Sequence, residues 1–205
     1  ENYVLTDEDK EALTASLKNI PAKLGKYAII GNHDKLESGY EAILIEAGFT
    51  IIKNNYELVY DNNQNSNLIY GLDSITIGNP SMEAIKKDMD KYESSFKILL
   101  VHEPDCFDEL EEEFKSYFDL VLAGHTHNGQ VWLPFFQDLI LPPYGKKYIK
   151  GNYQLNATTS LYISGGLGCS TFNYRLGNPP SINFYRIIKD FQNDYFKFLQ
   201  RRKFG

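Results

Sequence analysis

Short apolar runs along the chain alternate with segments in which apolar residues recur every three or four positions. Thr6 and the three acids after it are typical of a helix start, because a hydroxyl cap and acidic side chains stabilise the unpaired amides of the first turn. Leu13, Leu17 and Ile20 continue at helical spacing, and Pro21 follows. This pattern predicts a helix that ends before Pro21.

The same reasoning predicts the other elements of the chain. Runs that are apolar on both faces indicate buried strands at 96–101 and 120–123. Helices are expected at 40–47, 81–92 and 107–118, where apolar residues share one face. Further strands are expected at 26–30, 50–60 (with a turn at Asn54-Asn55), 68–72, 131–133, 161–164 and 182–188. Strands alternate with helices through the first two thirds, and the last third is mostly strand and loop. This order predicts a layered α/β domain, part parallel and part antiparallel.

Composition and charge narrow the class of protein. A length of 205 residues suits one domain, and 42% hydrophobic with 23% charged residues is typical of soluble globular chains. A net charge of -6 argues against a nucleic-acid partner, since phosphate backbones attract basic surfaces. The two cysteines, Cys106 and Cys169, lie far apart in sequence, which argues against a disulfide scaffold. No apolar run approaches the roughly 18 residues that a membrane-spanning helix needs.

All four histidines directly follow predicted strands. His33 follows the strand at 26–30, His102 follows 96–101, and His125 and His127 follow 120–123. Ligands of open α/β sheets bind beyond the carboxyl ends of the strands, so three separate segments would deliver imidazoles to one edge. A single histidine at a strand end is usually only a hydrogen-bonded polar residue. With no histidine elsewhere in the chain, the set favours a common site.

The residues around these histidines suit metal binding. Histidine-x-histidine on an extended loop can reach adjacent ions. Asn32 offers an amide oxygen suited to divalent cations. Asp34, beside His33, could hold that imidazole in one tautomer, as carboxylates do around metal ligands. Gly31 and Gly124 would let the backbone turn tightly and approach a ligand.

Three blocks in this order resemble the signature of the calcineurin-like metallophosphoesterases: Gly31-Asn32-His33-Asp34, Val101-His102 and Gly124-His125-Thr126-His127. The continuation through Gly129-Gln130-Val131 and the later Asn178-Pro179-Pro180 resemble a subgroup of bacterial envelope phosphodiesterases. The resemblance runs from about residue 5 to about residue 188. It implies an αββα sandwich of mixed sheets.

The resemblance also implies a role for each matching residue. Asn32, His102 and His125 would bind one metal ion, and His127 would bind a second. His33 would be the general acid, oriented by Asp34. Two divalent ions (Mn, Zn, Fe or Mg) would polarise the phosphoryl group and activate water for in-line attack.

Substrate and location follow from the resemblance as well. The expected activity is phosphodiester or phosphomonoester hydrolysis on a small-molecule or lipid-like substrate. Tyr174 and Arg175 are candidates for binding that substrate, although a surface or structural role is the more usual one for an arginine such as Arg175. The subgroup favours the cell envelope and the membrane surface; otherwise a cytoplasmic location is expected.

Two blocks of the family pattern are missing. The pattern opens with Asp-x-His and then Gly-Asp-x-x-Asp, but no glycine of this chain precedes an aspartate and no histidine has an aspartate two positions before it. Residues 1–205, which begin at Glu1 without a methionine, are therefore expected to be the C-terminal portion of one metallophosphoesterase domain that lacks its N-terminal strands. Alone, this portion is expected to be inactive and to bind at most one ion. Bare sheet edges would lead it to dimerise or swap strands.

Two other interpretations stay open. The domain could be a non-catalytic binding or scaffold module with a degenerate metal site, which the missing blocks favour and the His33-Asp34 pair opposes. A structural zinc protein is the weaker alternative, because structural zinc prefers closed ligand sets that contain cysteine.

Overall fold

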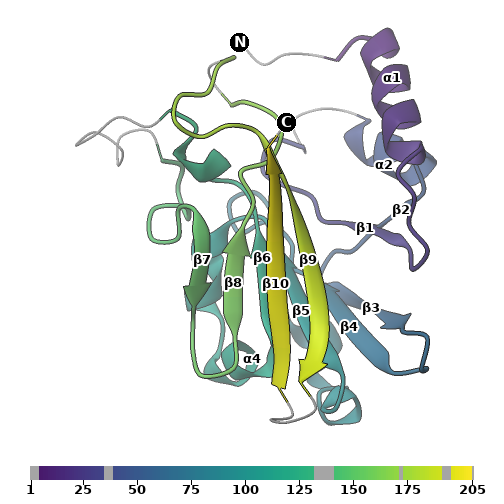
Figure 1. Ribbon diagram of the computed structural model, residues 1–205, viewed down its shortest axis with the longest axis vertical. Helices are drawn as coiled ribbons and strands as arrows, with labels where there is room; N and C mark the ends of the chain where they lie inside the picture. The colour runs from purple at the N-terminus through teal and green to yellow at the C-terminus, as the bar shows by residue number, and fades with distance from the viewer. Residues whose placement is uncertain (1–4, 35–38, 132–140, 171–172, 191–194, 205) are drawn as a thin grey trace. The chain divides into compact units, whose positions relative to one another are not determined.

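The two apolar runs at 96–101 and 120–123 each form a buried strand, and they belong to different halves of the chain. The computed structural model describes residues 5–34, 39–131, 141–170, 173–190 and 195–204 (Figure 1). The chain divides into two compact units, Glu1–His102 and Glu103–Gly205. Each unit combines helices with parallel and antiparallel strand pairs, which confirms the predicted α/β class with mixed sheets.

In the first unit, three strands run in the order β3-β4-β5. β3 (Asn55–Tyr60) is antiparallel to β4 (Ser66–Gly71), and β4 is parallel to β5 (Phe96–Val101). A separate parallel pair is formed by β1 (Lys26–Ala28) and β2 (Phe49–Ile51).

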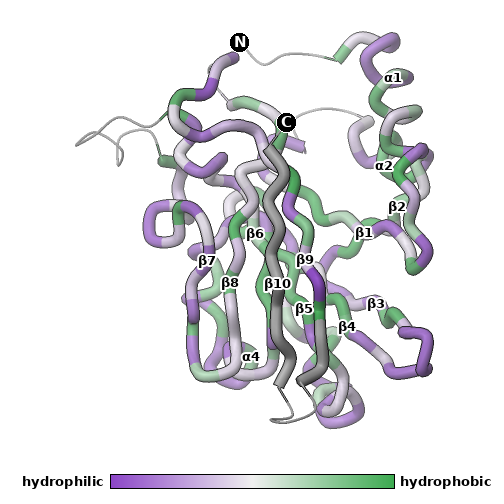
Figure 2. Tube along the Cα trace, viewed as in Figure 1, coloured by the Kyte–Doolittle hydropathy of each residue, from purple (hydrophilic) through white to green (hydrophobic). Residues whose placement is uncertain are grey.

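The apolar run of β5 explains its position in the core, and Figure 2 shows it mostly in the hydrophobic colour. Phe96, Leu99 and Val101 are buried. Lys97 is buried in the same strand, but its Nζ donates to the carbonyls of Glu93 at 2.9 Å and Ser95 at 2.8 Å. The charge is therefore compensated inside the core.

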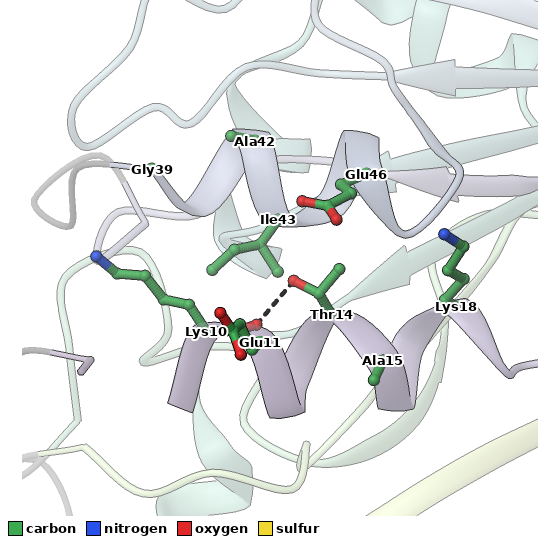
Figure 3. A pocket seen from close by; sticks show the side chains of 9 residues that line it. All are labelled: Lys10, Glu11, Thr14, Ala15, Lys18, Gly39, Ala42, Ile43 and Glu46. Carbon is green, nitrogen blue, oxygen red and sulfur yellow. Dashed lines mark hydrogen bonds between the residues drawn. The ribbon is translucent and has the colours of Figure 1, made fainter. Parts of the chain in front are cut away.

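The predicted first helix is α1 (Asp7–Lys18). The Thr6 hydroxyl accepts the Asp9 amide at 3.1 Å and the Asp9 carboxylate accepts the Thr6 amide at 3.0 Å, a reciprocal cap. α1 packs on α2 (Tyr40–Glu46), which confirms the helix expected at 40–47. Between them lies a groove of about 440 Å³ whose lining includes Thr14 and Ile43 and none of the histidines (Figure 3).

In the second unit, the strands run in the order β6-β8-β7. β6 (Leu120–Ala123) is parallel to β8 (Ser160–Ile163), and β7 (Gly151–Gln154) is antiparallel to β8. β9 (Ser181–Asp190) and β10 (Tyr195–Phe204) form a long antiparallel ribbon. The rings of Tyr162 on β8 and Tyr185 on β9 meet edge to face at 5.3 Å, joining the ribbon to this sheet.

Two predicted helices are shorter than expected. The helix at 81–92 is α3 (Glu83–Lys86) followed by a 3-10 turn (Asp90–Tyr92), because the Asp88 amide bonds the Ile85 carbonyl three residues back and tightens the turn. The helix at 107–118 is a 3-10 segment (Pro104–Glu109) followed by α4 (Glu112–Tyr117).

Long-range contacts of the acidic side chains explain this second break. The Asp105 carboxylate accepts the backbone amides of Lys146, Lys147 and Tyr148. Asp108 binds the Lys147 ammonium and the Tyr148 hydroxyl. These contacts with a distant loop outweigh the local helical preference.

The strands show three further differences from the sequence pattern. The segment at 50–60 does form two strands, β2 and β3, but each pairs with another strand rather than with its neighbour. β7 and β10 were not predicted. In the strand expected at 131–133, Val131 makes isolated bridges with Leu176 and Gly177, and the other two residues lie outside the described residues. Over the part of the chain that the structure describes, every helix is too short or too polar to cross a bilayer.

Candidate metal centre

Two predicted ligands lie together in the first unit. Asn32 follows β1 and His102 follows β5, and the Asn32 Oδ1 atom lies 2.9 Å from the His102 Nε2 atom. Two ligand atoms at right angles around one divalent ion, each bonded at 2.0–2.2 Å, are separated by about 3 Å. The contact is a hydrogen bond, in which the Nε2–H group of His102 donates to the Asn32 amide oxygen. The two atoms are close enough to bind one ion together once that proton is lost.

Gly31 makes this arrangement possible. A Cβ atom on Gly31 would lie 2.5 Å from the His102 Cε1 atom and 2.7 Å from both ring nitrogens. Carbon atoms do not approach that closely, so the ring can rest here only because residue 31 has no side chain. Gly31 thus permits a close approach by the His102 ring, while its expected approach to a bound ligand stays a prediction.

The turn from Gly31 to Asp34 is closed by Asp34 itself. Its Oδ2 atom accepts the Gly31 amide at 2.7 Å, and its own amide donates to the Gly31 carbonyl at 3.2 Å. Burial raises the pKa of Asp34, while the Gly31 amide and the nearby His33 ring lower it in part. The Asp34 carboxylate thus closes the turn through a hydrogen bond, and it interacts with the exposed His33 ring through its charge.

In the second unit, His125 is buried and its ring is oriented by the backbone. The Nε2 atom lies 2.8 Å from the Pro143 carbonyl oxygen. A carbonyl can only accept, so Nε2 carries the proton and Nδ1 is the nitrogen that can present a lone pair. A histidine that donates one ring N–H to a backbone carbonyl is the usual arrangement for a metal ligand.

The backbone around the two histidines is strained. His125, His127, Asn128 and Gln130 have φ angles of 66°, 50°, 57° and 31°, in the left-handed region. Such conformations cost about 1–3 kcal/mol each and persist where surrounding contacts impose them. Here the Thr126 hydroxyl donates to the Ile149 carbonyl at 2.7 Å and accepts the Asn128 amide at 3.2 Å.

His127 lies beside the loop that follows β8. Its Nδ1 atom is 3.3 Å from the Gly168 carbonyl oxygen and 3.1 Å from the Arg175 Nη2 atom. Arg175 also donates to backbone carbonyls, so its donors are directed at protein atoms. The Tyr174 side chain is 57% exposed, and its carbonyl accepts the Gln130 amide at 3.2 Å.

Sequence reasoning missed Gln130 as a structural support of this site. Its buried amide accepts from the Ser170 N–H at 2.7 Å and donates to the Ser170 carbonyl at 2.8 Å. The only available signal was its place just after the histidine pair, because the partner lies 40 residues away. At Gly124, no described atom would meet a Cβ within 4 Å, so its expected approach to a ligand stays a prediction.

The donor set is therefore imidazole and amide in two groups. Within neither unit, over the residues that the structure describes, do three or more histidine, cysteine, aspartate or glutamate side chains gather as an ion site. Asn32 and His102 are brought together, and His125 and His127 lie on one strained turn. A common site for the two groups stays a prediction.

Comparison with known proteins places these residues in context. Residues 5–129, more than half of the chain, match the pattern that describes the calcineurin-like phosphoesterases. This range includes all four histidines. No solved structure matched the chain.

Several curated bacterial proteins are similar to the chain. An uncharacterized metallophosphoesterase of Bacillus subtilis, YkuE, is 34% identical over 89% of this chain and 63% of its own length. An uncharacterized metallophosphoesterase of Helicobacter pylori is 30% identical over 90% of the chain and 49% of its own length. The phosphodiesterase YaeI of Escherichia coli is 27% identical over 79% of the chain and 58% of its own length. The chain thus spans about half to under two thirds of these relatives.

Proposed function

Because the chain belongs to the calcineurin-like phosphoesterase family, we propose that the whole protein hydrolyses phosphate esters with the help of divalent metal ions. The observation that carries this proposal is the 2.9 Å hydrogen bond between Asn32 and His102, which brings together two predicted ligands that lie far apart in the sequence. A relative of the chain is named a phosphodiesterase, which favours phosphodiesters as substrates.

The proposed roles are those that the family resemblance implies. Asn32, His102 and His125 bind one ion, the last through Nδ1, and His127 binds a second. Bound divalent ions supply charge stabilisation of the phosphoryl oxygens and a water of lowered pKa. His33 is exposed next to Asn32, so it can donate a proton to the leaving oxygen of a substrate held there. Asp34 keeps the turn that carries both residues closed.

For the 205-residue chain by itself we propose little or no turnover and at most one bound ion. The sequence has neither Asp-x-His nor Gly-Asp-x-x-Asp, so the bridging carboxylate of the family pattern is missing from it. Small or lipid-like phosphoesters are the proposed substrates. Dimerisation or strand swapping, membrane-surface association and a cell-envelope location stay predictions.

A non-catalytic scaffold is the second candidate, and the same missing blocks favour it. The two are separated by assaying hydrolysis of bis-p-nitrophenyl phosphate with Mn²⁺, using the protein translated together with its upstream reading frame. Phosphoesterase function predicts turnover that a chelator abolishes and Mn²⁺ restores. If upstream residues supply both missing blocks and no metal-dependent turnover appears, the scaffold interpretation replaces the enzymatic one.

A further inference from the structure

The guanidinium group of Arg175 contacts four backbone carbonyls, one of them that of His127. Its Nη1 atom lies 3.3 Å from the His127 and Asn178 carbonyl oxygens. Its Nη2 atom lies 2.7 Å from the Gly165 carbonyl, and its Nε atom lies 3.0 Å from the Gly168 carbonyl, which Nη2 also contacts. Arginine has five N–H donors in a rigid plane, and these contacts can use all of them.

The same group touches the ring of His127. Nη2 lies 3.1 Å from Nδ1, and the Gly168 carbonyl that Arg175 holds lies 3.3 Å from the same nitrogen. A guanidinium can only donate and a carbonyl can only accept. Four backbone carbonyls already accept the five N–H groups of Arg175, so the Nδ1–H group of His127 is left to donate to the Gly168 carbonyl.

We propose that Arg175 is a positioning residue for His127: it holds the Gly168 carbonyl against the Nδ1–H group of that ring, so that Nε2 is the nitrogen presented to an ion. This inference rests on the proposed phosphoesterase function, in which His127 is a ligand. It replaces the expectation that Arg175 binds substrate, because its five donors are committed to backbone carbonyls.

Gln130 provides further hydrogen bonds between the histidine turn and the segment that carries Arg175. Its buried side chain pairs with both backbone groups of Ser170, and its carbonyl accepts the Leu176 amide at 3.0 Å. The histidine turn and the loop that carries Arg175 are therefore tied together at two points. A lysine at position 175 would carry only one nitrogen and could not span the same acceptors.

The test is nitrogen-15 NMR of the four imidazole rings in the 205-residue chain, assigned by single histidine substitutions. In the unsubstituted chain we expect the His127 ring nitrogens to resonate apart from those of exposed His33. In Arg175→Gln they should move most of the way to the His33 positions, and millimolar guanidinium should reverse the shift in part. Arg186→Gln, an exposed arginine on β9, is the matched control and should leave the ring unchanged.

If Arg175→Gln does not fold, Arg175→Lys replaces it in this test. The lysine variant should show the same shift of the His127 ring nitrogens. A folded Arg175 variant with an unaltered His127 ring overturns the positioning role and leaves the phosphoesterase assignment intact. Absence of metal-dependent turnover in the whole wild-type protein overturns that assignment, and the positioning role with it, even if the ring shifts.

Discussion

In the unit Glu1–His102 the candidate ligands lie on relaxed backbone, whereas in the unit Glu103–Gly205 the backbone that carries them is forced into the left-handed region. Asn32 and His102 are placed by contact, and the essential feature is the missing side chain at Gly31. His125 and His127 are placed by conformation, and hydrogen bonds from Thr126 and Arg175 hold the turn. Adding a side chain at Gly31 should therefore destabilise the first unit. In the second unit, stability should depend on which residues can adopt a left-handed backbone conformation.

The largest expected effect comes from removing a proposed ligand from either unit. In the whole protein, His102→Ala and His125→Ala should each lower Mn²⁺-dependent turnover by about 10²–10³-fold, since charge stabilisation by a bound ion is worth several kcal/mol. Steady-state hydrolysis of bis-p-nitrophenyl phosphate measures it. Asn63→Ala, on an exposed loop, should have no effect. Equal activity in His102→Ala would remove the first unit from the site.

The next largest effect is expected from glycine-to-alanine substitutions, which should affect the two units differently. Gly31→Ala would press a Cβ into the His102 ring, so we expect a loss of about 1–3 kcal/mol in unfolding free energy and a 10–100-fold loss in metal affinity. Gly124→Ala is the matched control, because a Cβ there meets no described atom within 4 Å. Urea unfolding and Mn²⁺ titration of both variants test this. Similar losses in both would contradict the steric explanation.

At position 127 the glycine variant should be more stable than the alanine variant, and at position 33 it should be less stable. Both substitutions remove the ring, but alanine keeps a Cβ in a left-handed conformation only at His127, where φ is 50°. His127→Gly should thus be about 1 kcal/mol more stable than His127→Ala. His33→Gly should be about 0.5–1 kcal/mol less stable than His33→Ala. Chemical denaturation of the four variants measures the difference in unfolding free energy between the glycine and alanine variants. A difference of the same sign at both positions would contradict this explanation.

The smallest effect concerns the two thiols of the second unit. Burial raises the pKa of the Cys106 thiol, whereas Cys169 is exposed beside the Gly168 carbonyl that Arg175 holds. A thiol-specific disulfide reagent at mildly alkaline pH should modify Cys169 in the native protein and Cys106 only after unfolding. Cys169→Ser should then show no rapid reaction. Rapid labelling of Cys106 would show that the second unit opens more readily than its packing implies.

The sequence predicted the features that depend on local pattern. The buried strands β5 and β6 and the capped helix α1 follow from apolar runs and from Thr6 with its acids. The pairing of Asn32 with His102 could be anticipated because both follow strands. The Gly31 contact was anticipated only as a need for close approach, without its partner.

What sequence could not supply depends on partners far along the chain. Asp105 and Asp108 break the expected helix at 107–118 because they bind residues about 40 positions away. The donors of Arg175 and the amide of Gln130 are committed by backbone carbonyls that have no sequence signature. The left-handed φ angles at His125 and His127 could not be predicted either, because a histidine in a sequence does not indicate a positive φ as a glycine does.

Counting the ions bound by the whole protein and by its His102→Ala variant tests the central claim most directly. If Asn32 and His102 share an ion, equilibrium dialysis with Mn²⁺ should give about two ions per wild-type chain and about one per variant chain, from the ligand count. A variant that retains every ion of the wild type would contradict the claim that these two side chains form half of a metal centre.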